Sequence, residues 1–285
     1  MLKNYLKVVW RNIKRHKGYS FINIAGLALG LACCLLICIW VLDELSFDKF
    51  HENAPNLYRV EEDQDYSGRI YHVTVTPHPL APALKQEIPE IIDAARYVYA
   101  GGQLFRYGDQ AFYENSVRAV DPSFLKMMTF PLVHGDPDTA LDSPFSLILS
   151  QEQAKKYFGD ENPIGKVMTV NNEYELTITG VMENVPHNSS LQFDMLIPYE
   201  IMVRLGVTND SFGSNSITTL VQLQNGAAME QVNPKIRGFI KERVPQTTTE
   251  LMLMPYTRLH LHSYWGYEHD SGAVQYIYIF SIIAA

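Results

Sequence analysis

The chain has 285 residues, of which 19% are charged and 47% are hydrophobic, and its formal net charge is −8. The 15 prolines and 17 glycines exclude a collagen-like or largely disordered chain. The acidic balance argues against nucleic-acid binding, which requires a basic surface. The charge is unevenly distributed, because residues 1–18 hold six of the 23 lysines and arginines and none of the 31 acidic residues.

Residues 2–17 have the pattern of a short basic amphipathic helix. Apolar side chains recur at three- and four-residue spacing from Leu2 to Ile13, and lysines and Arg11 fall on another face. Such a helix suits the surface of an anionic inner leaflet, so membrane lipid is an expected partner. The alternative is a basic flank that only sets the orientation of the next segment.

Residues 21–42 form an uncharged run of 22 residues. At 1.5 Å per residue, a helix of this length spans about 33 Å, enough to cross a hydrocarbon core of ~30 Å. A cleaved signal peptide would have a shorter apolar region followed by a small-residue cleavage site, whereas this run ends at Asp43 and Glu44. The pattern therefore predicts a retained transmembrane helix.

The flanking charges predict the topology. Cations precede the apolar run and acids follow it, so the positive-inside rule places the N-terminus in the cytoplasm. We expect a cytoplasmic helix at 1–18, a transmembrane helix at 19–42 and an extracytoplasmic domain at 43–275. The chain would then lie in the inner (plasma) membrane, with its main domain in the periplasm.

Gly26 and Gly30 form a G-x-x-x-G motif within the apolar run. Small residues at this spacing allow two membrane helices to approach closely, so these two glycines are the candidate helix-packing residues. The alternative is a chance occurrence, since the motif is common in apolar helices.

The three cysteines, Cys33, Cys34 and Cys38, all lie in the same apolar run. The rest of the chain has none, which excludes a disulfide framework or a cysteine-based zinc site there. The domain after the membrane segment must therefore be stabilised by its own hydrophobic core.

Short strand and helix patterns alternate between the apolar run and residue 275 and predict an α+β domain. Ser67-Gly68 and Asn171-Asn172-Glu173 predict hairpin turns, Ser150 with Gln153 predicts a capping box, and Asp121 with Pro122 predicts a helix start. The predicted strands are 57–61, 70–76, 94–99, 112–120, 145–149, 167–170, 174–181, 193–197, 218–224 and 250–254, and the predicted helices are 79–87, 150–157, 229–243 and a short one after Asp121.

Residues 276–285 form an uncharged, mostly apolar run of ten. Ten residues are too few to cross a bilayer as a helix. A final buried strand and a C-terminal tail are two interpretations. The favoured one is the start of a second transmembrane helix that is cut off partway, because no stop signal follows.

Several stretches resemble the permease subunits of ABC transporters of the MacB/FtsX type, in particular those of Bacteroidetes-like bacteria. The resemblance begins with WRNIKRHKGYSFINIAGLALGLA and DELSFDKFHENAPNLYRV, and it continues in TPHPLAPALKQEIPEI and ITGVMENVPHNSSLQFDMLI. Its most specific stretches are VDPSFLKMMTFPLVHGDPDTAL and LSQEQAKKYFGDENPIGKVMTV. It covers residues 1–200 well and 201–275 loosely.

The resemblance implies an architecture and partners. Such permeases have one membrane helix, a large extracytoplasmic core domain and three further membrane helices. They act as homo- or heterodimers with a cytoplasmic ABC ATPase, some with a periplasmic adaptor, and ATP-driven movement is relayed to the outer domain for export or extraction of substrate. The present chain would be the N-terminal portion of such a permease.

No pattern in the chain indicates catalysis. FGDENPIGK resembles a phosphate loop, but Val167 follows Lys166 where a P-loop requires serine or threonine, so a turn is expected there. His260 and His262, two apart on a predicted extended stretch, would face one side, but no third metal ligand accompanies them. We expect no catalytic, cofactor or metal site, and no enzymatic activity.

The alternative function is a membrane-anchored sensor, in which an extracytoplasmic ligand domain precedes a cytoplasmic signalling module. Both functions share the topology predicted so far. Three further hydrophobic spans would favour the permease, whereas a heptad-rich helix with kinase-like motifs would favour the sensor. The first 200 residues favour the permease.

Overall fold

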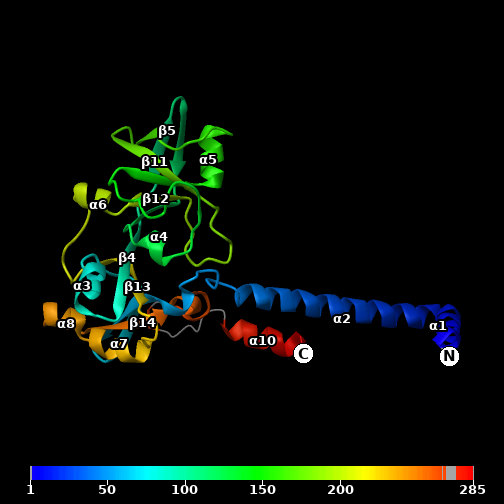
Figure 1. The fold of residues 1–285 in the computed structure, drawn as a ribbon. Coiled ribbons are helices and arrows are strands. Elements are labelled where there is room, and N and C mark those ends of the chain that lie inside the picture. Colours follow the sequence, from blue (N-terminus) through cyan, green and yellow to red (C-terminus); the bar gives the residue numbers. More distant parts are fainter. Residues whose placement is uncertain (1, 265, 268–273, 285) are drawn as a thin grey trace. The chain divides into compact units, whose positions relative to one another are not determined.

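The chain divides into two units in the computed structural model, which describes residues 2–264, 266–267 and 274–284 (Figure 1). The first unit consists of Met1–Leu45 and Ala273–Ala285, and the second consists of Ser46–Gly272 and is called the large domain below. Each unit has its own internal packing, and together they confirm the predicted class, a mixed α/β domain with an N-terminal apolar helix.

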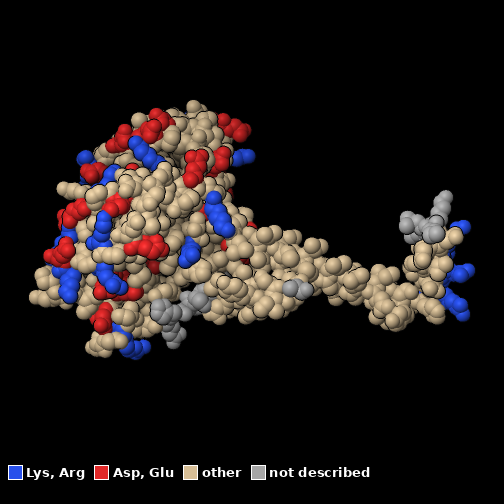
Figure 2. All heavy atoms as spheres, turned by 60° about the horizontal axis from the view of Figure 1, so that its bottom comes forward, with Lys and Arg blue, Asp and Glu red and all other residues tan. Residues whose placement is uncertain are grey.

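The first unit is built from three helices, α1 (Leu2–Arg15), α2 (Lys17–Glu44) and α10 (Val274–Ala284). Between Lys17 and Asp43, α2 carries no charged side chain, whereas blue cations crowd α1 (Figure 2). Among the described helices, α2 alone is long and apolar enough to cross a membrane. The last turns of α2 pack on α10, where the Trp40 and Phe280 ring centroids lie 5.2 Å apart.

The described strands of the large domain form one 14-stranded mixed sheet. Along the main path the order is β14-β1-β13-β4-β7-β12-β9-β11-β10-β5-β6, while β2 pairs with β1, β3 with β13 and β8 with β11. The strands are β1 (Leu57–Tyr66), β2 (Arg69–Val73), β3 (Thr76–Pro77), β4 (Ile91–Tyr99), β5 (Gln103–Tyr107), β6 (Gln110–Glu114), β7 (Val117–Val120), β8 (Leu132–His134), β9 (Ser146–Ser150), β10 (Val167–Val170), β11 (Tyr174–Met182), β12 (Met195–Pro198), β13 (Asn215–Leu223) and β14 (Thr249–Pro255).

Short helices cover the sheet. The described helices of the large domain are η1 (Ala54–Asn56), α3 (Leu80–Glu87), α4 (Phe124–Met127), α5 (Gln151–Phe158), α6 (Glu200–Arg204), α7 (Met229–Ile236), α8 (Phe239–Arg243), η2 (Tyr256–Arg258) and α9 (Leu259–His262). The hydroxyl of Ser150 accepts a bond from the Gln153 N–H at 3.2 Å, which confirms Ser150 as the cap of α5. The return bond of the predicted capping box is not formed, because the Ser150 N–H donates to the Asp194 carbonyl instead.

Two hairpin turns have the geometry that their sequences predict. Ser67 and Gly68 connect β1 to β2 with φ of 57° and 86°, and Asn171 and Asn172 connect β10 to β11 with φ of 54° and 58°. Glycine and asparagine tolerate this left-handed backbone, which matches the twist of the strands they connect. The pairing register of each hairpin is therefore fixed locally.

Two predicted elements are each split in the structure. The strand expected at 112–120 is split into β6 and β7, because residues 110–114 pair back on β5 whereas residues 117–120 pair with β4 and β12. The helix expected at 229–243 is split at Gly238 into α7 and α8. Strands β5 and β8 were not predicted.

The predicted helix start at Asp121 is also wrong. Asp121 does not cap a helix with its side chain; its carboxylate accepts bonds from the backbone N–H and the guanidinium of Arg96, at 2.7–2.9 Å. The helix itself exists as α4, which begins at Phe124 without a side-chain cap. The Asp121 carboxylate therefore pairs with Arg96 on β4, whereas the local sequence pattern predicted that it would cap the helix.

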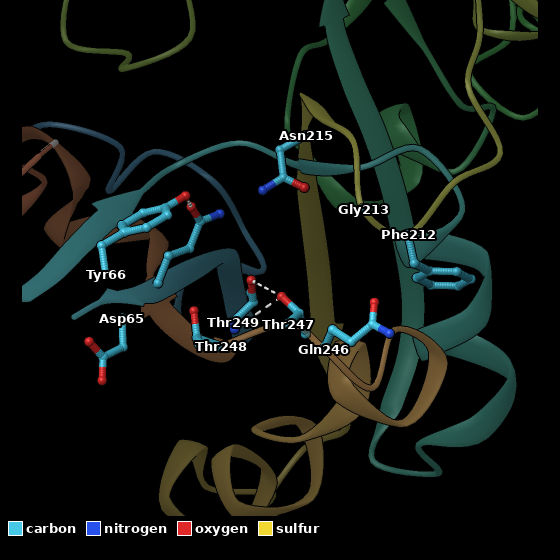
Figure 3. Close-up of a pocket in the computed structure, with 10 residues that line it drawn as sticks. Asp65, Tyr66, Phe212, Gly213, Asn215, Gln246, Thr247, Thr248 and Thr249 are labelled. Atoms are coloured by element: carbon cyan, nitrogen blue, oxygen red, sulfur yellow. Dashed lines mark hydrogen bonds between the residues drawn. The ribbon is translucent and has the colours of Figure 1, made fainter. Parts of the chain in front are cut away.

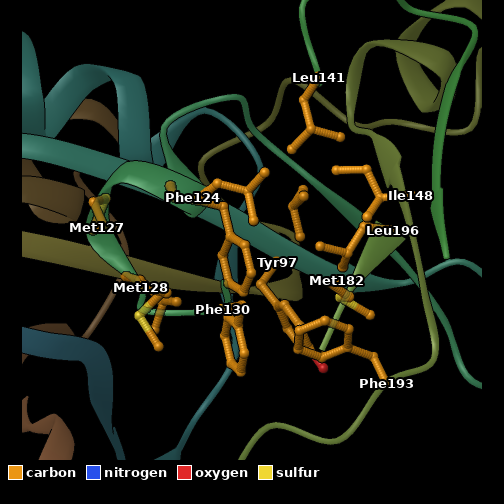
Figure 4. Close-up of a cluster of buried hydrophobic side chains, with 14 of the residues drawn as sticks. Tyr97, Phe124, Met127, Met128, Phe130, Leu141, Ile148, Met182, Phe193 and Leu196 are labelled. Atoms are coloured by element: carbon orange, nitrogen blue, oxygen red, sulfur yellow. The ribbon is translucent and has the colours of Figure 1, made fainter. Parts of the chain in front are cut away.

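Three hydrophobic clusters form the core of the large domain. In the central one, Phe124, Phe130 and Phe193 pack with Tyr97, and the Phe130 and Phe193 ring centroids lie 4.9 Å apart (Figure 4). This cluster draws side chains from strands along most of the path, from Leu57 of β1 to Met182 of β11. It therefore joins the part of the sheet next to β1 to the part that carries α5.

Candidate functional site

Two segments connect the large domain to the helices of the first unit, and both are fixed within the large domain. The incoming segment, residues 46–53, follows α2, and the outgoing segment, residues 256–264 with 266 and 267, leads toward α10. The residues that hold these segments form the candidate functional site, called the clamp below. They are Phe47, Asp48, Ser190 and His260, together with Arg59, Glu61, Asp63 and His72.

The incoming segment is held by a buried carboxylate. Asp48 is fully buried and accepts bonds from the backbone N–H and the hydroxyl of Ser190, while its own N–H donates to the Asn188 carbonyl at 2.9 Å. Burial raises the pKa of Asp48, and the bonds from Ser190 oppose that shift. Asp48 adopts a φ of 59°, so the chain turns sharply at this point.

Rings connect the incoming segment to the outgoing one. Phe47 stacks on His260 with ring centroids 3.5 Å apart and planes 5° from parallel, and the ring centroid of His51 lies 5.3 Å from that of Tyr256. Nδ1 of His51 accepts the Thr129 N–H at 3.0 Å, and burial lowers the pKa of His51 to about 4, so its ring is neutral at physiological pH. The two segments are therefore packed against each other.

The outgoing segment is held by four charged groups on β1 and β2. Glu61 is fully buried, its Oε1 accepts from Arg59, and its Oε2 lies 2.8 Å from Nε2 of His72. Nδ1 of His72 lies 2.8 Å from Oδ1 of Asp63. Because carboxylates only accept, both ring nitrogens of His72 must donate, and the ring is protonated. Two cations thus balance two anions, as a buried ionic network requires.

The residues of this charged network contact the outgoing segment directly. Arg59 donates to the Ser263 hydroxyl, and the Tyr264 ring stacks on His72 with centroids 4.1 Å apart. The backbone of His72 exchanges two hydrogen bonds with Gly266, at 2.9 and 3.0 Å. Tyr267 packs on β2, with the Arg69 guanidinium 4.4 Å from its ring centroid. Side-chain and backbone contacts therefore converge on the same few residues.

The charged network leaves His72 without a free ring nitrogen. Both nitrogens of His72 are engaged by carboxylates, so the ring has no lone pair with which to act as a base. Burial lowers the pKa of His72, but the hydrogen bonds and charges of Glu61 and Asp63 outweigh it, and the net shift is upward. Among the described residues, no group of three or more His, Cys, Asp or Glu side chains could hold a metal ion.

The structure corrects one sequence-based prediction and confirms another. His260 and His262 do not lie on an extended stretch, because they belong to the helical turn α9, and His260 is occupied by its stack on Phe47. The FGDENPIGK stretch forms the connection between α5 and β10, as predicted.

Gly26 and Gly30 lie on the exposed length of α2. A Cβ atom built at either glycine meets nothing within 4 Å, so no described part of the chain packs there. Four-residue spacing places Gly30 on the same helix face as Cys34, whose thiol donates to the Ala284 carbonyl at 3.2 Å. Cys34, one turn from Gly30, thus contacts α10, and close packing at the glycines themselves remains a prediction.

Sequence reasoning missed the clamp but contained a signal for it. The Ser67-Gly68 turn fixes the register that places His72 opposite Asp63. An acid and a histidine directly across a hairpin form a favourable pair. The contacts with Ser263, Tyr264 and Gly266 have no such signal, because they join residues about 190 or more positions apart along the chain.

Comparison with known proteins identifies the fold. A family model described as the MacB-like periplasmic core domain matches residues 20–239, more than half of the chain. The chain belongs to this family. No curated protein matches the chain.

Solved structures agree with the family match. A domain of a protein described as a permease, from Porphyromonas gingivalis, is 25% identical with a TM-score of 0.61, covering 72% of this chain and 92% of that one. The periplasmic region of MacB from Actinobacillus actinomycetemcomitans is 15% identical with a TM-score of 0.52, covering 70% and 89%. The extracellular domain of the noncanonic ABC-type transporter YknZ from Gram-positive bacteria is 14% identical with a TM-score of 0.50, covering 70% and 100%. The predicted resemblance is confirmed, and the large domain has the MacB-like fold.

The charged clamp of this MacB-like domain predicts a stability that depends on pH. The folded pKa of His72 lies above its ordinary value of 6.5, so its contribution is fully present below pH 6.5 and is lost as the pH rises through the folded pKa. His72→Gln should therefore cost about 1.5–3 kcal/mol near pH 5.5, typical of bonds to charged groups, and less near pH 9. Urea unfolding of the chain in lipid nanodiscs, followed by circular dichroism, measures the difference.

The matched control is His134→Gln, because His134 is an exposed histidine on β8. It should leave the free energy of unfolding unchanged at both pH values. An equal loss for His72→Gln at both pH values would contradict the protonated state of His72.

The glycine motif predicts helix association. If Gly30 lies at a close crossing between two copies of α2, Gly30→Leu should weaken association by roughly 1 kcal/mol, because the leucine side chain separates the backbones. A membrane two-hybrid assay measures this, with Ala28→Leu as the control, since residue 28 lies on the opposite helix face. Equal effects of the two substitutions would reject the glycine contact.

Proposed function

We propose that this chain is a permease subunit of an ABC transporter of the MacB/FtsX type. In this function, a cytoplasmic partner ATPase hydrolyses ATP, and the resulting movement of the membrane helices is relayed to the large domain for export or extraction of a substrate. The chain itself does not hydrolyse ATP. We further propose that such permeases act as homo- or heterodimers in the inner membrane, with a periplasmic adaptor as a further partner. The N-terminus would lie in the cytoplasm and the large domain in the periplasm.

The observation that carries the proposal is the clamp. Both segments that connect the large domain to the helices are held at one place, by the Phe47–His260 stack and by the charged network of β1 and β2. A domain that only displayed a ligand site could be attached through flexible linkers. Connecting segments that are packed into the domain support a domain that receives movement from its helices, and the family match does not favour the sensor alternative.

The proposed topology predicts the result of a reporter fusion. A reporter that is active only outside the cytoplasm should be active when inserted at Ser211, which is exposed in the loop before β13. The reason is the cation-rich N-terminal flank, which the positive-inside rule retains in the cytoplasm. The same reporter fused before Met1 should be inactive, and the reverse pair of results would reject the orientation.

The proposed coupling predicts an uncoupled variant. The tagged full chain is purified from its own membranes with its ABC ATPase, and deuterium exchange of residues 46–53 and 256–264 is measured with and without ATP. ATP should change the exchange of both segments in the wild type. Phe47→Ala should retain the ATPase but reduce the change, because the stack between the two segments is lost.

The control for the coupling experiment is Tyr113→Ala. Tyr113 is 64% exposed on β6, at the other end of the strand order from β14. It should behave like the wild type. Failure of any ABC ATPase to co-purify, or an ATP response that Phe47→Ala leaves intact, would contradict the proposed relay.

A further inference from the structure

A polar cavity of about 370 Å³ opens on the large domain at the end of β1 (Figure 3). Its walls come from three separate parts of the chain, the end of β1, the loop that leads into β13 and the segment that leads into β14. The lining residues are Gln64, Asp65, Tyr66, Phe212, Gly213, Asn215, Gln246, Thr247, Thr248 and Thr249. In Figure 3 the side chains of Tyr66, Asn215, Thr247 and Thr249 lie around one common space, whereas the Phe212 ring and the Asp65 carboxylate point away from it.

A buried carboxylate orients two amides of this wall. Glu62 is 1% exposed, and its Oε2 accepts from the side-chain amides of Gln64 at 3.1 Å and Asn215 at 2.5 Å. Because each NH₂ group donates to Glu62, each amide oxygen points away from it. The Gln64 oxygen accepts the Tyr66 hydroxyl at 2.7 Å. Two acceptors are thus fixed at the wall, and burial raises the pKa of Glu62 to about 7.

Threonine hydroxyls form the opposite wall. The hydroxyl of Thr247 donates to that of Thr249 at 2.8 Å and accepts the Thr249 N–H at 3.2 Å, whereas Thr248 is exposed. A hydroxyl can donate or accept, so this wall adapts to either kind of ligand group. The cavity therefore presents fixed acceptors on one side and adaptable hydroxyls on the other.

The charge of the wall disfavours anions. No lining residue is a lysine or arginine, and Asp65 adds a negative charge. The nearby guanidinium of Arg243 lies 5.1 Å from the Phe212 ring centroid but is paired with Glu87. A phosphate or carboxylate ligand would meet no unpaired cation among these groups, whereas an uncharged ligand would meet no electrostatic barrier.

The ring of Tyr66 completes the wall, whereas the ring of Phe212 packs against a hydrophobic cluster and the Arg243 guanidinium. Tyr66 is 54% exposed, and Phe212 is half-buried at the far side. An exposed ring offers apolar area, and its negative face attracts C–H groups. A ligand with both C–H faces and many hydroxyls would satisfy the Tyr66 ring and the polar groups together.

We propose that this cavity binds a neutral saccharide unit. Sugar hydroxyls donate to the oxygen of Asn215 and exchange bonds with Thr247 and Thr248, while the C–H face of the ring packs on Tyr66. The volume lies within the range of small-molecule sites, about 300–1,000 Å³. Saccharide binding at this cavity goes beyond the proposed transmission of movement from the membrane helices, and it does not require the ATPase.

Ligand-detected saturation-transfer NMR tests the proposal on the full chain in lipid nanodiscs, with empty nanodiscs subtracted. The saccharide probes are chitobiose and maltose, and a trilysine peptide and inorganic phosphate serve as charged probes. At least one saccharide should receive saturation and titrate to a dissociation constant. Thr248→Val and Tyr66→Ala should each weaken binding by about fivefold or more, as expected for a lost hydrogen bond or ring contact.

Thr169→Val is the matched control, because Thr169 lies on β10, away from the cavity lining. It should bind saccharide like the wild type, and circular dichroism verifies that each variant is folded. Binding of neither saccharide, equal binding by cavity and control variants, or binding of trilysine or phosphate alone would overturn the proposal. No ATPase is present in this experiment. Its outcomes therefore do not depend on the proposed coupling between ATP hydrolysis and the large domain.

Discussion

The alternation of side chains along β1 is the constraint on which both features of the large domain depend. Glu61 and Asp63 point to one face of the strand and meet His72, whereas Glu62 and Gln64 point to the other, where Glu62 accepts bonds from Gln64 and Asn215. Glu61 and Glu62 are both buried, which would be strongly unfavourable if they shared a face. Opposite faces give each carboxylate its own donors, so one strand supports the clamp and the polar cavity.

β1 is paired along both of its edges, and this position suits it to receive force from the clamp. β1 pairs with β14 along one edge and with β13 and β2 along the other, so a force on the outgoing segment reaches a strand held on both sides. The central cluster around Phe130 and Phe193 then joins this end of the sheet to the end that carries α5. Close-packed interiors transmit displacement with little compression, which suits a domain moved as one body.

Local patterns determined most of the elements. The Ser67-Gly68 and Asn171-Asn172 turns and the Ser150 cap depend on residues close in sequence, and all three have the predicted geometry. The errors arose where distant residues competed for the same group. Asp121 bonded to Arg96 rather than to a helix, and residues 112–120 were divided between β5 on one side and β4 and β12 on the other.

The sequence by itself determined the apolar helix, the charge asymmetry and the α+β class, because each depends on composition or on short spacings, and the resemblance of several stretches to known permeases indicated the family. It also contained the Asp63–His72 pair, since the hairpin turn fixes that register. Only the tertiary structure brought Ser263 to Arg59, Phe47 to His260 and Asn215 to Glu62, across roughly 150 to 210 residues of chain. Such contacts depend on the order of strands in the sheet, and alternation within a single strand specifies the face of a side chain but not its partner.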